Sequence, residues 1–138
     1  MKKEVKIQVK GLQRDEEAEE KVETAAFGEC DITGEGCCLK YDEISEDGNV
    51  TKTLIRITKE RIEVIKRGAI ESEMIFVPGT VTETKYNTCY GVLDMAVDTA
   101  HAEYEMMEEG IRAEIGYVLY LNGSRISVNL LNITAVFL

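Results

Sequence analysis

The sequence predicts an all-β fold of about eight to ten antiparallel strands, arranged as a sandwich or as a closed barrel. Apolar residues recur at every second position through most of the chain, which is the period of a half-buried strand. Short turns rich in glycine separate these runs, and such short connections pair neighbouring strands antiparallel. The length of 138 residues fits one domain that spans residues 1–138.

The strand period is clearest in five runs. They lie at residues 5–10, 54–58, 93–99, 111–121 and 126–137. In the last run, Ile126, Val128 and Leu130 begin the alternation, which then slips by one place and continues from Leu131. A slip of this kind predicts a β-bulge near Leu130 and Leu131.

The segments between the runs contain the residues that tight turns require. Asn122-Gly123 is the strongest signal, because both residues tolerate the positive φ of a type I′ hairpin turn. Further turns are predicted at Gly34-Glu35-Gly36, Asp47-Gly48, Pro78-Gly79 and Glu109-Gly110. The acidic segment 15–23 has good helix formers but almost no apolar face. We therefore expect residues 15–18 to form a charged hairpin loop, after which the chain re-enters the sheet.

The charge balance narrows the classes of partner. Acidic residues number 26 and basic residues 16, which gives a net charge of −10. This charge would repel a nucleic-acid backbone or an anionic membrane, so we expect neither as a partner. No run approaches the roughly 20 apolar residues of a membrane-spanning helix, and no signal peptide is recognisable. We expect a cytoplasmic protein with four reduced cysteines, no metal and no cofactor, since the cysteines lack the spacing of a zinc site.

The segment from Ile115 to Leu138 contains a single charged side chain, that of Arg125. Val118 and Tyr120 lie on the face opposite the inward row, so this hairpin is weakly polar on both faces. Such a hairpin is either a central strand pair covered on both sides or part of a subunit contact. Because the chain is short for a covering layer, the sequence favours a homodimer contact through this hairpin.

Catalytic chemistry has little support in the sequence. The common motifs of serine hydrolases, phosphate-binding loops, dinucleotide folds and zinc proteases are all missing from it. His101 is the only imidazole, and we expect a solvated loop residue rather than a general base. Cys30, Cys37 and Cys38 are expected to be inert, because acidic neighbours would raise the pKa of a thiol there. The sequence therefore predicts no catalytic residue and no enzymatic activity.

The middle of the chain resembles a known family. Arg67-Gly68-Ala69, Met74-Ile75-Phe76, Pro78-Gly79 and the run from Tyr86 to Leu93 follow one another at suitable distances. Upstream, Tyr41-Asp42-Glu43 and the run from Thr53 to Ile57 fit the same pattern. These segments are similar to those of the YwiB-like family of small bacterial proteins, a calycin-like (lipocalin-like) β-barrel family without an assigned function. The resemblance implies a closed antiparallel up-and-down barrel rather than a sandwich.

A barrel of about eight strands either fills its interior with side chains or holds one small ligand. The residues that we expect to face the interior and to bind a ligand carry hydroxyl or guanidinium groups. They are Arg67, Tyr86, Thr88, Tyr90, Tyr104 and Arg112. In this interpretation Tyr86, Thr88 and Tyr90 form a polar ladder on one strand face, and an arginine pairs with a carboxylate or a phosphate. The alternative is structural: Arg67 supports the barrel, and the tyrosine hydroxyls are satisfied internally.

The sequence thus favours a non-catalytic binding module for a small ligand held in the barrel. The alternative is a protein-interaction module with a filled barrel, which acts through its outer surface or a homodimer contact. A third and less favoured hypothesis is a hydrolase or an isomerase that uses a carboxylate beside Arg67 in the barrel mouth.

Overall fold

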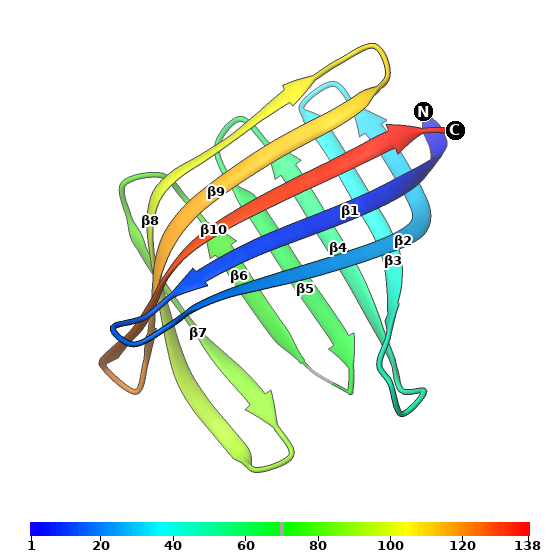
Figure 1. Ribbon diagram of the computed structural model, residues 1–138. Helices are drawn as coiled ribbons and strands as arrows, with labels where there is room; N and C mark the ends of the chain where they lie inside the picture. The colour runs from blue at the N-terminus through cyan, green and yellow to red at the C-terminus, as the bar shows by residue number, and fades with distance from the viewer. Residues whose placement is uncertain (70) are drawn as a thin grey trace.

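The computed structural model describes residues 1–69 and 71–138, apart from the side chain of Thr88. In this part of the chain ten strands form a single sheet (Figure 1). They are β1 (Lys2–Arg14), β2 (Glu19–Thr33), β3 (Gly36–Ile44), β4 (Val50–Thr58), β5 (Ile62–Gly68), β6 (Ser72–Phe76), β7 (Val81–Thr88), β8 (Gly91–Met106), β9 (Gly110–Leu121) and β10 (Ser124–Phe137). The described residues include no helix long and apolar enough to cross a membrane.

The strands form a meander that curls into a nearly closed barrel, which confirms the predicted fold. Their order in the sheet is β6-β5-β4-β3-β2-β1-β10-β9-β8-β7, and each neighbouring pair is antiparallel. The first and last strands pair along their length, so the two ends of the chain lie together (Figure 1). The seam lies between β6 and β7. Across it the amide of Asn87 donates to the carbonyl of Glu71 at 3.2 Å, and the Thr82 hydroxyl donates to the carbonyl of Ile75.

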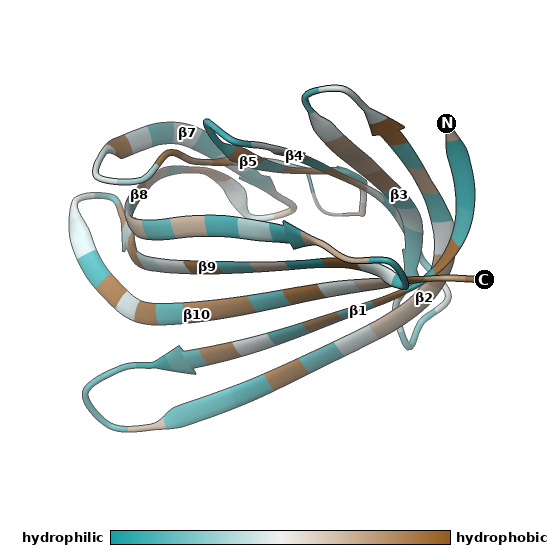
Figure 2. Ribbon diagram, turned by 90° about the horizontal axis from the view of Figure 1, so that it is seen from above, coloured by the Kyte–Doolittle hydropathy of each residue, from teal (hydrophilic) through white to brown (hydrophobic). Residues whose placement is uncertain are grey.

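Alternate side chains fill the interior. Figure 2 shows apolar and polar bands alternating along β1, β9 and β10, as the strand period predicts. The largest side chains that are almost fully buried form one core cluster. They are Val5, Ile7, Leu39, Ile55, Ile57, Ile62, Phe76, Val97, Ile111, Ile115 and Ile133. Burial of one such side chain contributes roughly 1.5–3 kcal/mol, so this inner face is the main source of stability.

The predicted turns are confirmed where their chemistry is most specific. Asn122 has a φ of 49° and Gly123 a φ of 82°, as a type I′ turn requires. The 15–18 segment is the loop between β1 and β2. Its Asp15 carboxylate accepts hydrogen bonds from the amides of Glu17 and Ala18 at 2.8 and 2.7 Å, and these bonds lower the pKa of Asp15.

The bulges differ from the prediction. The register of β9 and β10 shifts between Arg125 and Ser127, so the predicted bulge at residues 130–131 is wrong. Ile126 and Val128 therefore lie on the outer face, 38% and 42% exposed, although the alternation suggested an inward position. The extra residue is taken up next to the turn, which leaves the rest of β10 regular. A further bulge, between Thr99 and His101 on β8, was not predicted.

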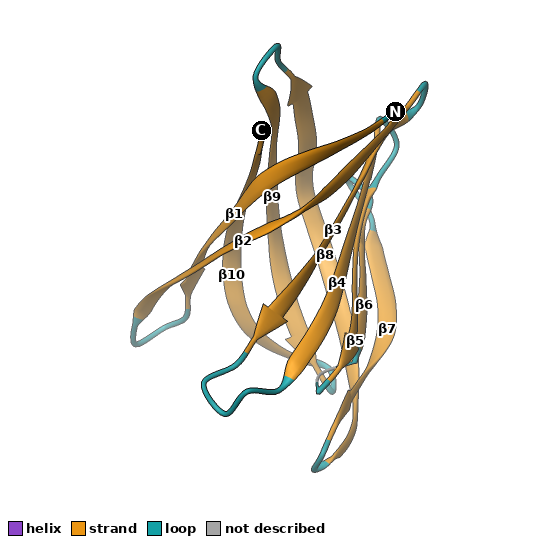
Figure 3. Cartoon of the chain, turned by 90° about the vertical axis from the view of Figure 1, so that its right-hand side faces the viewer, coloured by secondary structure: helices purple, strands orange, loops and turns teal. Residues whose placement is uncertain are grey.

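β2 and β3 separate toward the end of the barrel that holds the 15–18 loop. They pair from Gly28↔Tyr41 to Thr33↔Gly36, whereas residues 19–27 of β2 have ladder partners only on β1 among the described strands. Figure 3 shows the β1–β2 and β3–β4 hairpins diverging beyond this point. A Cβ on Gly28 would lie 2.2 Å from the carbonyl oxygen of Lys40, so the close crossing of the two strands depends on glycine. The separation leaves the barrel open on one side.

Candidate functional site

The pairing register arranges the inward side chains of β3 to β6 in rows. The row nearest the chain ends is Cys37, Ile57, Ile62 and Phe76. The next row is Leu39, Ile55, Val64 and Met74. Both rows are apolar and belong to, or pack against, the core cluster. This half of the barrel is therefore filled with side chains.

The third row changes to polar residues. It consists of Tyr41, Thr53, Lys66 and Ser72, one from each of the four strands. Glu43 and Thr51, which pair with each other, lie one row closer to the open end. We call these six residues the inner polar belt. Tyr41, Thr51, Thr53 and Ser72 are only 3–7% exposed, so the belt lies inside the barrel wall.

Glu43 is the centre of the contacts within the belt. The Lys66 ammonium lies 3.3 Å from its carboxylate, and the Tyr41 hydroxyl donates a hydrogen bond to Glu43 Oε1 at 3.2 Å. Burial raises the pKa of Tyr41, and the nearby negative charge of Glu43 raises it further. The phenol therefore stays protonated and keeps its role as a donor.

The Thr53 hydroxyl lies in the middle of the belt and is not satisfied. It is close enough to Tyr41 to favour the phenolate slightly, but it does not reach hydrogen-bond geometry with any described residue. A buried polar group without a partner costs about 1–3 kcal/mol. The Thr53 hydroxyl is thus a buried polar group of the belt whose hydrogen bonding the described residues leave incomplete.

The gap between β2 and β3, which we call the side opening, reaches the belt from outside. It has a volume of about 550 Å³. Its lining residues are Thr24, Ala25, Ala26, Phe27, Asp42, Glu43, Ile44, Ser45, Thr51 and Ala69. Glu43 and Thr51 belong to both the opening and the belt, so the two are continuous. The lining combines two carboxylates and three hydroxyls with apolar side chains.

The rim of the side opening is strongly apolar. Phe27 is 71% exposed and Ile44 is 73% exposed, and both line the opening. Single exposed apolar residues are common, but these flank one opening from both sides. The site therefore presents an apolar rim and a polar base.

Of the ligand residues predicted from the sequence, two face the interior. Tyr86 pairs with Leu93 and shares a face with the buried Met95. Tyr104 packs against the core cluster. The Thr88 side chain lies outside the described residues. The tyrosines are half-buried and come from β7 and β8, on the other side of the seam from the belt.

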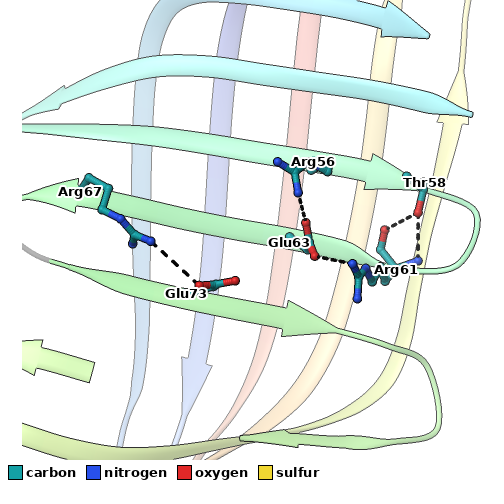
Figure 4. Close-up of polar contacts among 6 residues, drawn as sticks. All are labelled: Arg56, Thr58, Arg61, Glu63, Arg67 and Glu73. Atoms are coloured by element: carbon teal, nitrogen blue, oxygen red, sulfur yellow. Dashed lines mark hydrogen bonds and ion pairs between the residues drawn. The ribbon is translucent and has the colours of Figure 1, made fainter. Parts of the chain in front are cut away.

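The remaining predicted residues do not face the interior, and this part of the prediction is wrong. Arg67 lies on the outer face, where its guanidinium donates to the carbonyl of Lys66 at 3.0 Å and lies 3.9 Å from the Glu73 carboxylate (Figure 4). Arg112 also points outward and pairs with Glu105 at 3.0 Å. Tyr90 lies in the turn after β7 and is 98% exposed. Strand alternation explains why both arginines point outward. Arg67 therefore does not lie beside a carboxylate in the barrel mouth, as the hydrolase or isomerase hypothesis requires.

Sequence reasoning missed the inner polar belt, although part of its signal was present. Thr51 and Thr53 continue the alternation of Ile55 and Ile57 on β4, so their inward position could have been inferred. Glu43 and Lys66 are 23 residues apart, and no local pattern shows that they meet. The prediction chose Arg67, the neighbour of Lys66, and a shift of one residue on a strand moves a side chain to the opposite face.

His101 and the cysteines lie away from the belt. His101 is half-buried within β8 rather than in a loop, and its Nε2 lies 3.0 Å from Glu114 Oε1 on the outer face. A bulge before His101 allows β8 to continue through this position, so the residue lies in a strand rather than in the predicted loop. Cys30 and Cys37 are buried. Burial raises the pKa of both thiols, that of Cys37 to about 12, and leaves them protonated.

Known proteins with similar sequences and folds support this architecture. The uncharacterized β-barrel protein YwiB of Bacillus subtilis (strain 168) is 26% identical over 130 residues, which cover 94% of this chain and 91% of that protein. The crystal structure of the YwiB protein from Bacillus subtilis matches with a TM-score of 0.87 at 24% identity. That match covers 99% of this chain and 92% of the crystallised one, and it shows the fold. The family model of the domain of unknown function DUF1934 matches residues 7–133, and the chain therefore belongs to the DUF1934 family.

Proposed function

We propose that the protein is a non-catalytic binding module that takes one small amphipathic molecule into the side opening. The observation that carries the proposal is the continuity between the apolar rim and the inner polar belt. Phe27 and Ile44 would hold the apolar part of the molecule, and Glu43 and Thr51 would bind its polar end. Small-molecule sites characteristically combine an apolar lining with a few convergent polar groups.

The charges of the lining favour a ligand with a hydrogen-bond donor, in particular an amine. The carboxylates of Asp42 and Glu43 line the side opening, and the Lys66 ammonium behind them is already paired with Glu43. The net charge of −10 favours a cation over an anion at long range. The Thr51 hydroxyl, which lines the opening, would add a further polar contact.

This use of the fold would be lipocalin-like in that one small ligand would occupy a partly open β-barrel. The two apolar rows between the belt and the chain ends fill that half of the barrel, so the ligand would occupy the half that contains the side opening. We place the function in the cytoplasm. The four cysteines are free in the described structure, which fits a reducing compartment.

A fluorescent amine tests the proposal. Monodansylcadaverine has an aromatic apolar end and a primary amine, and its emission rises when the dansyl group leaves water. We expect saturable binding of one molecule per chain, and weaker binding of dansylamide, which has no amine. Phe27→Ala should weaken binding of both probes, and Asp42→Asn should weaken binding of the amine alone.

The matched controls are Val92→Ala and Glu46→Gln, which remove an exposed apolar side chain and a carboxylate outside the lining. Equal effects of Phe27→Ala and Val92→Ala would overturn the proposal, because the probe would then bind apolar surface in general. Native mass spectrometry of protein purified from cells should show an added mass that Phe27→Ala diminishes.

A second candidate function is protein interaction through a homodimer contact on the outer face of β1, β8, β9 and β10. The observation that favours it is an apolar groove of about 350 Å³ on this face. Leu12, Val118, Val128 and Leu130 contribute its apolar side chains. The groove includes part of the hairpin for which the sequence predicted a homodimer contact.

Analytical ultracentrifugation tests this second candidate. A dimer at micromolar concentration should dissociate when Val128→Asp places a charge in the groove. Val92→Asp is the matched control, because Val92 is also exposed but lies outside the groove. A wild-type chain that sediments only as a monomer would contradict a homodimer contact.

A further inference from the structure

Three potential metal ligands converge on the outer face of the barrel, away from the side opening. They are His101 and Glu103 of β8 and Glu114 of β9. One ligand atom from each side chain lies within 4.8 Å of the other two. His101 and Glu114 are in direct contact, with Nε2 3.0 Å from Oε1, and their side chains are 41% and 44% exposed. The group is therefore compact and accessible to an ion from solvent.

The sheet itself brings the three side chains together. His101 and Glu103 are two residues apart on β8 and so project from the same face. Glu114 is the cross-strand partner of Glu103. Two of the ligands therefore come from β8 and the third from the neighbouring β9. All three project from the outer face, so solvent can reach the space between them. The rigid ladder fixes their separation without a dedicated loop.

Two local features orient the imidazole. The β-bulge between Thr99 and His101 sets the outward direction of His101, and bulges commonly re-aim a side chain in this way. The partner of His101 across the ladder is Gly116, and the imidazole lies over it. A Cβ at position 116 would lie 2.3 Å from His101 Cε1 and would displace the ring. Glycine thus provides the space that holds Nε2 beside Glu114.

Repulsion between the two carboxylates of the group favours the binding of a cation. Glu103 and Glu114 are like charges directly opposite each other, an arrangement that destabilises an antiparallel pair. Arg112, which lines the same pocket as these carboxylates, is paired with Glu105. One imidazole, whatever its charge, cannot offset two carboxylates in a chain whose net charge is already −10. A divalent cation between the three groups would convert this repulsion into attraction.

We propose that His101, Glu103 and Glu114 form a divalent-cation site that binds Zn²⁺. An imidazole with two carboxylates is a donor set that zinc accepts, at ligand distances of about 2.0–2.2 Å. Small rotations about the side-chain bonds would bring the ligand atoms to these distances. Three protein ligands leave a fourth position for water, as in open zinc sites.

Calorimetric titration of the Cys89→Ser variant with ZnCl₂ tests the site, because Cys89 is the exposed thiol that would compete for zinc. We expect one ion per chain. His101→Asn, Glu103→Gln and Glu114→Gln should each weaken binding by about tenfold or more. The matched control is Glu105→Gln, which removes the same charge from the same face of β8 and should change the affinity less than about twofold.

The single histidine supplies an independent readout. Zinc should shift the imidazole resonances of His101 in NMR spectra of the same protein, and it should fail to do so in Gly116→Ala, with folding checked by the amide spectrum. An equal loss of affinity in Glu105→Gln and Glu103→Gln would overturn the proposal, since it would indicate diffuse attraction to an acidic surface. Zinc binding that survives His101→Asn unchanged, or no binding in the wild-type background, would overturn it as well.

Discussion

The Lys66 ammonium and the Glu43 carboxylate meet over a strand to which neither belongs. Lys66 extends from β5 and Glu43 from β3, and their charged groups lie 3.3 Å apart on the inner side of β4. Their side chains are 29% and 25% exposed, so solvent screens the pair only in part. The pair therefore links three strands at the open end of the barrel, close to where β2 and β3 separate.

Removal of Lys66 should destabilise the fold measurably. Lys66→Met leaves the Glu43 carboxylate half-buried without its cation, which should lower the free energy of unfolding by about 1–2 kcal/mol. Urea denaturation measures the change. Lys85→Met is the matched control, because the Lys85–Asp94 pair is shorter, at 2.7 Å, but more than 70% exposed on both sides. It should leave the urea midpoint almost unchanged, and equal effects of the two variants would contradict the role of burial.

Stability should fall steeply in alkaline solution. Tyr117 packs against Phe76, with ring centroids 4.8 Å apart, and burial raises its pKa from 10.0 to about 12. The unfolded chain releases this proton near pH 10, whereas the folded protein holds it until about pH 12. The contribution of Tyr117 is thus complete below pH 10 and is lost as the pH rises from 10 to about 12.

Urea midpoints between pH 8 and pH 12 test this expectation. Tyr117→Phe should flatten the alkaline decline, and the same change at the outward Tyr120 should leave it steep. A wild-type midpoint that stays constant through this range would contradict the prediction.

Thiol reactivity should differ sharply among the cysteines. Cys89 is exposed, whereas Cys30 and Cys37 are buried and have raised pKa values. An aromatic disulfide reagent at neutral pH should therefore modify Cys89 rapidly, and it should reach Cys30 and Cys37 only when the barrel opens. In Cys89→Ser the rapid phase should disappear. Rapid modification of Cys37 in the folded protein would contradict the observed burial.

Glu63 should contribute more to the free energy of unfolding than its position on the outer face suggests. It is 4% exposed, and its carboxylate lies between Arg56 at 2.8 Å and Arg61 at 3.0 Å (Figure 4). Glu63→Gln should lower the free energy of unfolding by about 1–3 kcal/mol, because charge-assisted hydrogen bonds are lost at a buried acceptor. Glu73→Gln is the control, since Glu73 is half-exposed and lies 3.9 Å from Arg67. Equal denaturation midpoints for the two variants would contradict the prediction.

The sequence predicted the fold well because the fold depends on a period that every strand repeats. Ile111, Ala113 and Ile115 alternate without interruption, and the turn at Asn122-Gly123 has no competing interpretation. Bulges were harder to locate, since an extra residue can be absorbed at several places with little change in the pattern. At residues 125–127 the ladder absorbs it beside the turn, where few pairs are disturbed.

The candidate site was only partly predictable, because it depends on which side chains meet across the barrel. Tyr86 and Tyr104 face inward as predicted, but neither belongs to the inner polar belt. Arg67 was chosen for its chemistry, while Lys66, with similar chemistry, has the inward position. The approach of Lys66 to Glu43 and the separation of β2 from β3 are both tertiary, and no local signal encodes them.

The free margin of β2 has a consequence for how the protein behaves in concentrated solution. Among the described strands, residues 19–27 pair only with β1, so their backbone N–H and C=O groups on the other side could pair with a strand of another copy of the chain. Strand addition of this kind leads to fibril growth. Glu19, Glu20, Lys21 and Glu23 lie along this edge, and charged side chains on an unpaired strand edge oppose the addition of another strand. At acidic pH these carboxylates become neutral, and the protein should then form fibrils that grow from this edge of β2.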